Sequence, residues 1–410
     1  MLLKKVKMKL LQNYKKITIQ LLVFWTLFIT IARALRMPND FSEAHWLLDY
    51  RFGFMKRGLI GTISNFFSSI FDYSITPELI AIYSGIIFSI FVISIFLISR
   101  NLLEKFDYNL DIVLFLSIFS SSSFMVMSGH LFGYFDALIY VFTFVSIGLV
   151  FKQKLGTAAI IQTIAVLTHE SYILIGLPLV LLALVVEYER KDFTAITRKA
   201  IILFSAPMAT FALLIIYQSL FLDSEILRQQ LVGYLGSFDF VSTRVNHVAD
   251  YQTRSFLNFL SVQFQYLDDR LLDKNLLVSV GPALLALLYF IHSALRITPF
   301  SKFSFLLIGV ITVPLAMHAI AWDASRIWTY TLAGAFLSLW ILSKRRETDA
   351  IGNSFALIAI PAILINIYTS IPLMDSEIER YSHLYRTVYY LPVILLFINV
   401  LIGKFRKFSF

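Results

Sequence analysis

The sequence predicts an all-α protein: a polytopic transmembrane helix bundle of about 12 spans, forming a single membrane domain over residues 1–410. Hydrophobic residues make up 58% of the chain and charged residues 15%, against about 45–50% and roughly 25% in soluble proteins. One soluble core cannot bury so much apolar surface, so lipid must cover part of it. Apolar stretches of membrane length also recur along the whole chain, separated by short charged segments.

The chain begins with the basic segment MLLKKVKMKLLQNYKK, followed by an apolar run. No small-residue cleavage site follows this run, so we interpret it as an uncleaved first span rather than a signal peptide. A span needs about 20 mostly apolar residues. On that rule the predicted spans are 17–35, 78–99, 111–128, 134–151, 155–169, 171–187, 200–222, 276–295, 303–320, 327–343, 351–372 and 388–403.

The fifth and sixth spans are the shortest part of this prediction. Residues 155–187 are barely enough for two crossings at about 1.5 Å per residue. Either both helices are short, or they form a re-entrant pair and the chain has ten spans. The choice between these alternatives does not change the side of the membrane on which any loop lies.

The distribution of charge predicts the orientation. The N-terminus and every second loop after it contain 22 of the 35 basic residues but 8 of the 26 acidic ones. Because Lys and Arg are retained on the cytoplasmic side, we expect both termini there. The net charge of +9 is explained in the same way, so we expect no nucleic-acid partner. The absence of cysteine excludes disulfides, thiolate metal sites and cysteine nucleophiles.

Reactive residues concentrate on the predicted outer face, which has two long loops, 36–77 and 223–275, and several short ones. In the first, Asp49 is a candidate base or metal ligand, and Arg51, Lys56 and Arg57 are candidates to bind a phosphate. The alternative is that these side chains are headgroup anchors and solvated charges. Residues 59–71 are amphipathic, which predicts an interfacial helix in this loop. Six of the seven histidines lie on this face: His45, His130, His169, His247, His318 and His383.

Three shorter outer loops add further candidates. His130 and Asp136 would flank the mouth of two spans, unless they only bind a carbonyl and cap a helix. His169 and Glu170 lie so close to the lipid that a functional role is favoured over a structural one, and both are candidate catalytic residues. The loop between the predicted spans 303–320 and 327–343 contains Trp322, a candidate to stack on a sugar ring. In the same loop Asp323 and Arg326 form either a structural pair or a pair that binds a phosphate.

In these features the chain resembles multi-pass membrane glycosyltransferases of the GT-C type. Those enzymes have a long first outer loop with an acidic catalytic residue and an interfacial helix, which implies Asp49 and residues 59–71 here. The chain also resembles bacterial surface-polysaccharide (O-antigen) polymerases and ligases, which implies roles for the 223–275 loop, His169 and Arg326. The paired acidic motif of several GT-C branches is absent from this sequence.

Both resemblances imply the transfer of sugars from a polyprenyl-phosphate-linked donor at the outer face, during synthesis of a cell-surface glycan. The expected partners are a polyprenyl-linked sugar or oligosaccharide and membrane lipid. The sequence leaves a divalent metal open but contains no convincing ligand set. A transporter or flippase of lipid-linked sugars, or a non-catalytic membrane scaffold, remains the alternative to an enzyme.

Overall fold

The computed structural model describes residues 2–188, 193–347, 351, 353–374 and 377–408. Arg190 and Lys191, which belong to the basic loops counted above, lie outside these residues. Every regular element in the described part of the chain is a helix, which confirms the all-α prediction. The helices of the first half are α1 Leu2–Ala32, α2 Asp40–Leu47, η1 Tyr50–Phe52, α3 Gly58–Phe71, α4 Pro77–Lys105, α5 Leu110–Ser120, α6 Ser123–His130, α7 Asp136–Phe151, α8 Leu155–Thr168, α9 Tyr172–Ile175 and α10 Leu177–Tyr188.

The second half continues in the same pattern, with several short helices between the long ones. These helices are α11 Phe193–Leu220, α12 Ser224–Leu235, η2 Asp239–Val241, α13 Val245–Thr253, α14 Phe256–Gln263, η3 Phe264–Tyr266, α15 Leu267–Leu271, α16 Lys274–Ala294, α17 Lys302–Thr312, η4 Val313–Ala319, α18 Ala324–Ser343, α19 Asn353–Tyr368, α20 His383–Tyr389 and α21 Leu391–Phe408.

Six helices in the described residues are long and apolar enough to cross a membrane. They are Asn13–Ala32, Pro77–Lys105, Leu110–His130, Ile196–Leu220, Lys274–Ala294 and Lys302–Ala319. Shorter apolar helices occupy most of the other predicted spans, including 134–151, 155–169 and 171–187. Several long apolar helices in one chain indicate a membrane protein.

Side chains that cap the helices explain where several of them begin. Thr76 accepts a hydrogen bond from the Leu79 amide, and Pro77 occupies the first turn of α4. Asn109 caps α5 through the amide of Ile112, and Asp273 caps α16 in the same way. Each cap satisfies an amide that the helix itself leaves unpaired, so these starts are encoded locally.

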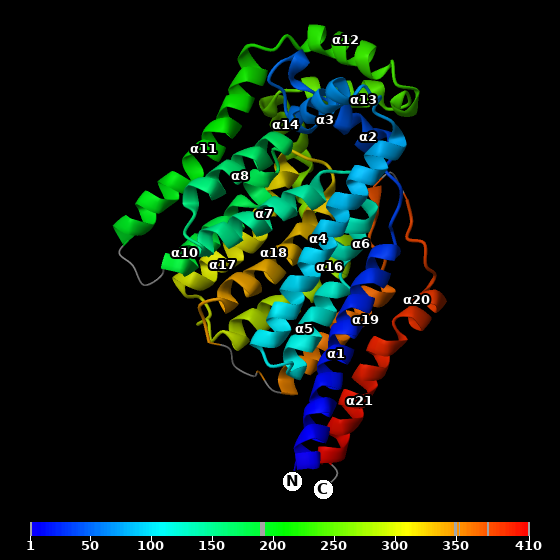
Figure 1. Ribbon diagram of the computed structural model, residues 1–410, viewed down its shortest axis with the longest axis vertical. Helices are drawn as coiled ribbons and strands as arrows, with labels where there is room; N and C mark the ends of the chain where they lie inside the picture. Colours follow the sequence, from blue (N-terminus) through cyan, green and yellow to red (C-terminus); the bar gives the residue numbers. More distant parts are fainter. Residues whose placement is uncertain (1, 189–192, 348–350, 352, 375–376, 409–410) are drawn as a thin grey trace.

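The core is built around α18, which lies in the middle of the bundle (Figure 1). It packs against α16, α10, α17 and α6, and nearly all of its side chains are buried. Phe336 of α18 stacks on Phe119 of α5 with ring centroids 3.9 Å apart. Because protein surrounds α18 on all sides, its N-terminal residues are held in fixed positions beside the neighbouring helices.

The loops 36–77 and 223–275 fold together at the end of the molecule opposite the two termini (Figure 1). Helices α2, α3, α12 and α13 gather there around a separate small core. Its buried side chains include Trp46, Leu48, Leu231, Leu235 and Val248. The two long loops therefore form one helical cap, which covers the candidate site described next.

Candidate functional site

A cavity of about 310 Å³ lies between the helical cap and the bundle, and we refer to it as the arginine cavity. Its charged and polar residues come from four segments that are far apart in the sequence: residue 57 before α3, residues 169–171 between α8 and α9, α13, and the start of α18. Its charged and polar lining consists of Arg57, His169, Glu170, Ser171, Tyr251, Asp323 and Arg326. Its apolar lining includes Phe211, Phe256, Leu260, Met317 and Ile320.

Arg57 connects three of these segments. Its guanidinium donates to both carboxylate oxygens of Glu170, at 2.8 and 3.2 Å, and to the hydroxyl of Tyr251 at 3.0 Å. A further nitrogen lies 3.1 Å from Nε2 of His45. The Arg57 backbone adopts a left-handed conformation, φ 62° and ψ 12°, which costs an L-residue about 1–2 kcal/mol. The hydrogen bonds of the side chain offset that cost.

Glu170 is held as a charged carboxylate by this arrangement. Burial alone would raise the pKa of its carboxyl group, but Arg57, His169 and Lys56 outweigh burial and hold the pKa well below its ordinary value. A carboxylate of such low basicity is a poor proton acceptor. Glu170, which the sequence suggested as catalytic, is therefore better suited to positioning Arg57.

Arg326 forms the second ion pair of the site, at the first turn of α18. Its Nε and one terminal nitrogen donate to the two carboxylate oxygens of Asp136, at 2.9 and 2.7 Å. The hydroxyl of Tyr330 donates to Asp136 as well. Another nitrogen of Arg326 lies 3.3 Å from the Asp323 carboxylate, as the spacing of three residues predicted. Asp136 thus binds an arginine instead of capping α7.

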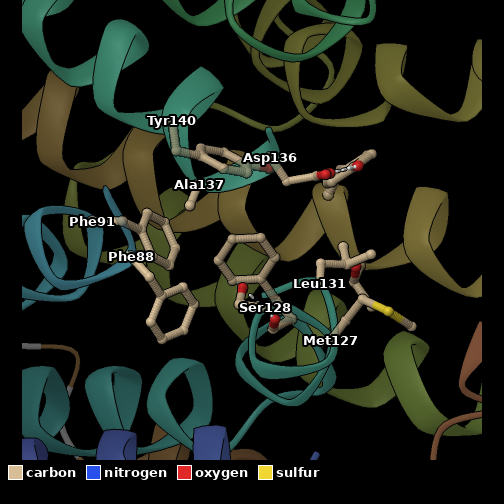
Figure 2. Close-up of a pocket in the computed structure, with 11 residues that line it drawn as sticks. Phe88, Phe91, Met127, Ser128, Leu131, Asp136, Ala137 and Tyr140 are labelled. Atoms are coloured by element: carbon tan, nitrogen blue, oxygen red, sulfur yellow. Dashed lines mark hydrogen bonds between the residues drawn. The ribbon is translucent and has the colours of Figure 1, made fainter. Parts of the chain in front are cut away.

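A small pocket on the bundle side of Asp136 is too small for a substrate (Figure 2). Its volume is about 10 Å³, which is room for about one water molecule. Apolar and aromatic side chains surround it, including Phe88, Phe91, Met127 and Tyr140. The arginine cavity, by contrast, has room for a larger molecule beside Arg57 and Arg326.

His169 follows the last residue of α8, and hydrogen bonds fix its ring. Its Nδ1 accepts from the backbone amide of Ser171 at 3.2 Å and lies 2.8 Å from the Ser171 hydroxyl. The ring is neutral, because an Nδ1 atom that accepts from a backbone amide carries no proton. Since Nδ1 accepts from an amide, the proton of the neutral ring resides on Nε2. The ring therefore acts as a hydrogen-bond donor through Nε2.

Asp323 is the carboxylate of this site that is best suited to accept a proton. It precedes α18 without capping it through its side chain, and it lines the arginine cavity. Burial raises the pKa of its carboxyl group above the ordinary value, although Arg326 opposes this shift. A higher pKa makes a carboxylate a stronger base.

Lys56 adjoins the site within the same loop as Arg57. Its Nζ lies 4.3 Å from the ring centre of Tyr251 and 4.5 Å from that of Phe259, an arrangement that stabilises a cation. Burial nevertheless lowers its pKa to about 7. Lys56 lines a neighbouring cavity of about 60 Å³ that shares Glu170 and Tyr251 with the arginine cavity.

The other candidates lie outside the arginine cavity. Asp49 is buried and accepts hydrogen bonds from the amide and Nε of Arg51, and from the Asn65 side chain at 2.6 Å. The Arg51 guanidinium in turn lies over the ring of Tyr234, 4.8 Å from its centre. These contacts brace η1 against α3 and α12. Asp49 thus serves this loop as a structural anchor.

His130 and Trp322 also lie elsewhere. The His130 ring is buried, with its Nδ1 3.6 Å from a carboxylate oxygen of Glu377. Trp322 is 60% exposed and lines a different cavity, to which we return below. Among the described residues, no group of three or more His, Asp or Glu side chains could hold a metal ion.

The sequence did not single out two tyrosines and one serine that belong to the site. Tyr251 binds Arg57, Tyr330 binds Asp136, and Ser171 fixes the His169 ring. Ser171 could have been found from its position two residues after His169. The tyrosines gave no such signal, because the chain contains 20 of them and their role depends on distant partners.

Comparison of the chain with protein-family models, with curated proteins and with solved structures finds no match. The interpretation of the site therefore rests on its own geometry. That geometry defines a membrane-protein cavity lined by apolar side chains together with arginines, carboxylates and a histidine.

Proposed function

We propose that this protein is a membrane enzyme that transfers a sugar from a polyprenyl-phosphate-linked donor to an acceptor hydroxyl. The observation that carries the proposal is the arginine cavity, whose lining combines apolar side chains with Arg57 and Arg326. A lipid-linked sugar combines the same two properties, in its prenyl chain and its anionic phosphate. Arginine's planar fork suits the phosphate, and the apolar side chains suit the chain.

The proposed setting is the outer face of a bacterial cytoplasmic membrane, crossed about twelve times with both termini in the cytoplasm. Both termini lie at one end of the molecule and the helical cap lies at the other (Figure 1). The basic residues Lys344 and Arg345 follow α18 at the end away from the arginine cavity. This distribution agrees with the retention of basic residues on the cytoplasmic side.

Helix α3 supports this setting, because its apolar side chains have no protein to cover them. Ile63, Phe66, Phe67 and Ile70 are 43–61% exposed, whereas the buried residues of α3 are two glycines. In water such a surface would be unfavourable, but it suits a helix that lies in the membrane interface. In that position α3 would hold Arg57, which directly precedes it, at the level of the lipid headgroups.

The prenyl chain would enter beside α11, at the edge of the bundle (Figure 1). Most of the apolar surface of α11 is exposed, but Phe211 turns toward the arginine cavity. Phe256 and Leu260 of α14, with Ile320, complete an apolar path to the two arginines. A lipid that followed this path would place its phosphate beside Arg57 and Arg326.

The phosphate must compete with carboxylates for these arginines. Arg57 is fully engaged with Glu170, but the contact between Arg326 and Asp323 is longer, at 3.3 Å. We infer that the phosphate replaces Asp323 at Arg326, and that the Nε2 hydrogen of His169 also binds it. This exchange would free the Asp323 carboxylate at the moment when the reaction needs a base.

The transfer step follows from this arrangement. The acceptor hydroxyl gives its proton to the Asp323 carboxylate while its oxygen forms a bond to the anomeric carbon of the sugar. The bond between that carbon and the phosphate oxygen breaks, and its electron pair remains on the phosphate. Arg57 and Arg326 stabilise the charge on the leaving phosphate, and Asp323 later returns its proton to water.

The test uses the full chain in lipid nanodiscs with polyprenyl-phosphate-linked hexoses that carry a radiolabel in the sugar. We expect the wild type to release the polyprenyl phosphate and to transfer or hydrolyse the labelled sugar. Asp323→Asn should lower this rate about 100-fold or more, because the amide cannot accept a proton. Asp268→Asn, which alters an exposed carboxylate outside the cavity, should leave the rate unchanged.

Two outcomes would contradict the proposal. One is that Asp323→Asn and Asp268→Asn are equally active. The other is that the wild type cleaves none of the donors but moves a fluorescent lipid-linked sugar between leaflets in proteoliposomes, which would identify a flippase.

A further inference from the structure

A second cavity, also of about 310 Å³, adjoins the first at Asp323, and we refer to it as the tryptophan cavity. It is lined by Asp273, Leu276, Trp322, Asp323, Ala324, Ser325 and residues 372–374. The two cavities share Asp323 and otherwise have different linings. A carboxylate that borders two cavities can contact a molecule in each.

The lining of the tryptophan cavity is suited to a different ligand from that of the arginine cavity. Trp322 is 60% exposed, and Asp273, Asp323 and Ser325 line the same cavity. Exposed indole faces bind the apolar faces of sugar rings, and carboxylates and hydroxyls accept or donate hydrogen bonds to sugar hydroxyls. Among the residues that the structure describes, this lining includes no arginine or lysine that would attract a phosphate.

We infer that the tryptophan cavity binds a saccharide, the acceptor of the transfer reaction, with one sugar ring on Trp322 and one hydroxyl at Asp323. The role of acceptor rests on the proposed function, but the binding of a saccharide in this cavity does not depend on catalysis. The lipid-linked donor would approach Asp323 from the arginine cavity and the acceptor from the tryptophan cavity. The acceptor hydroxyl and the anomeric carbon would then meet beside one carboxylate, which takes the hydroxyl proton.

The first experiment measures binding. The full chain in nanodiscs is mixed with methyl glycosides of glucose, galactose, mannose and N-acetylglucosamine, and saturation transfer from protein to sugar protons is recorded by NMR. We expect at least one glycoside to give a signal that Trp322→Ala removes and Trp322→Phe partly keeps. Tyr385→Ala removes another exposed aromatic side chain, outside both cavities, and should leave the signal unchanged. Trp322 is exposed, so neither substitution at that position should prevent folding.

The second experiment separates the roles of the two cavities. If the wild type turns over a donor, Trp322→Ala should raise the KM for the acceptor about tenfold or more, while the KM for the donor stays the same. Tyr385→Ala should change neither constant. A matching rise in both KM values would indicate general damage to the site and would overturn the assignment of the acceptor to the tryptophan cavity.

The inference and the proposed function can fail separately. If no glycoside gives a signal that depends on Trp322, the saccharide site is refuted, even if Asp323→Asn abolishes donor cleavage. If glycosides bind at Trp322 but the wild type cleaves no lipid-linked donor, the saccharide site stands and the transferase proposal fails.

Discussion

The ion pair between Arg57 and Glu170 offers the sharpest test of how the site is held together. Glu170→Gln keeps the shape of the side chain and one hydrogen bond but removes the charge that balances Arg57. The Arg57 side chain is 7% exposed, so water can replace little of that charge. Removal of one partner of a buried pair costs about 3–5 kcal/mol.

Glu170 is less buried than its partner, and this reduces the expected cost. Its side chain is 23% exposed, and Tyr251 and His45 still contact the guanidinium. We therefore expect Glu170→Gln to lower the free energy of unfolding by about 2–3 kcal/mol. In a chain of this length the loss corresponds to a drop in Tm of about 2–4 °C.

The assay is thermal unfolding of the detergent-solubilised protein at one scan rate, for the wild type, Arg57→Gln, Glu170→Gln and the double variant. If the two groups form a coupled pair, the double variant should be more stable than the sum of the single losses predicts, by about 2 kcal/mol. Purely additive losses, or a Glu170→Gln variant with the Tm of the wild type, would refute the reasoning.

Three further predictions concern residues around the site. Lys56 has a pKa of about 7 because it is buried, against 10.5 for an ordinary lysine, so unfolding takes up a proton between these pH values and stability rises with pH across that window. Lys56→Met should therefore raise the Tm more at about pH 6 than at about pH 9. An equal rise in Tm at the two pH values would contradict the lowered pKa of Lys56. Glu379 pairs with two buried arginines, at 2.6 and 3.0 Å, so Glu379→Gln should destabilise the protein by about 3–5 kcal/mol, measured by the same thermal assay. A Cβ on Gly61 would lie 2.0 Å from the Leu48 carbonyl oxygen, whereas a Cβ on Gly148 meets no atom within 4 Å. Gly61→Ala should thus cost about 1–3 kcal/mol while Gly148→Ala is neutral or stabilising, and equal Tm values would show that α2 and α3 do not pack as described.

Much of the helical architecture could be predicted because hydrophobicity and capping are local properties. Stretches such as 78–99 and 276–295 are mostly apolar, and they correspond to the helices of membrane length Pro77–Lys105 and Lys274–Ala294. The sequence also separated the reactive residues from the plain charged turns. The cavity lining brings together five of those candidates: Arg57, His169, Glu170, Asp323 and Arg326.

Their partners could not be predicted in the same way. Arg57 and Glu170 are 113 residues apart, and Asp136 and Arg326 are 190 apart. Whether such residues meet depends on which helices pack together, and hydrophobic patterns do not specify that. Asp49, in contrast, has partners that are close in the sequence. It accepts hydrogen bonds from Arg51 and from Asn65 of α3, and it lies outside the arginine cavity.

The sequence by itself determined that this chain forms long apolar helices and that its ionisable side chains gather near the ends of some of them. The cost of placing charges and unpaired backbone groups in lipid is sufficient to impose both features on the sequence. Only the tertiary structure decided which charges neutralise one another, that the two long loops form one cap, and that Asp323 borders two cavities. These features arise from the packing of segments distant in the chain, both around α18 and in the separate core of the cap, where shape and burial together select the partners.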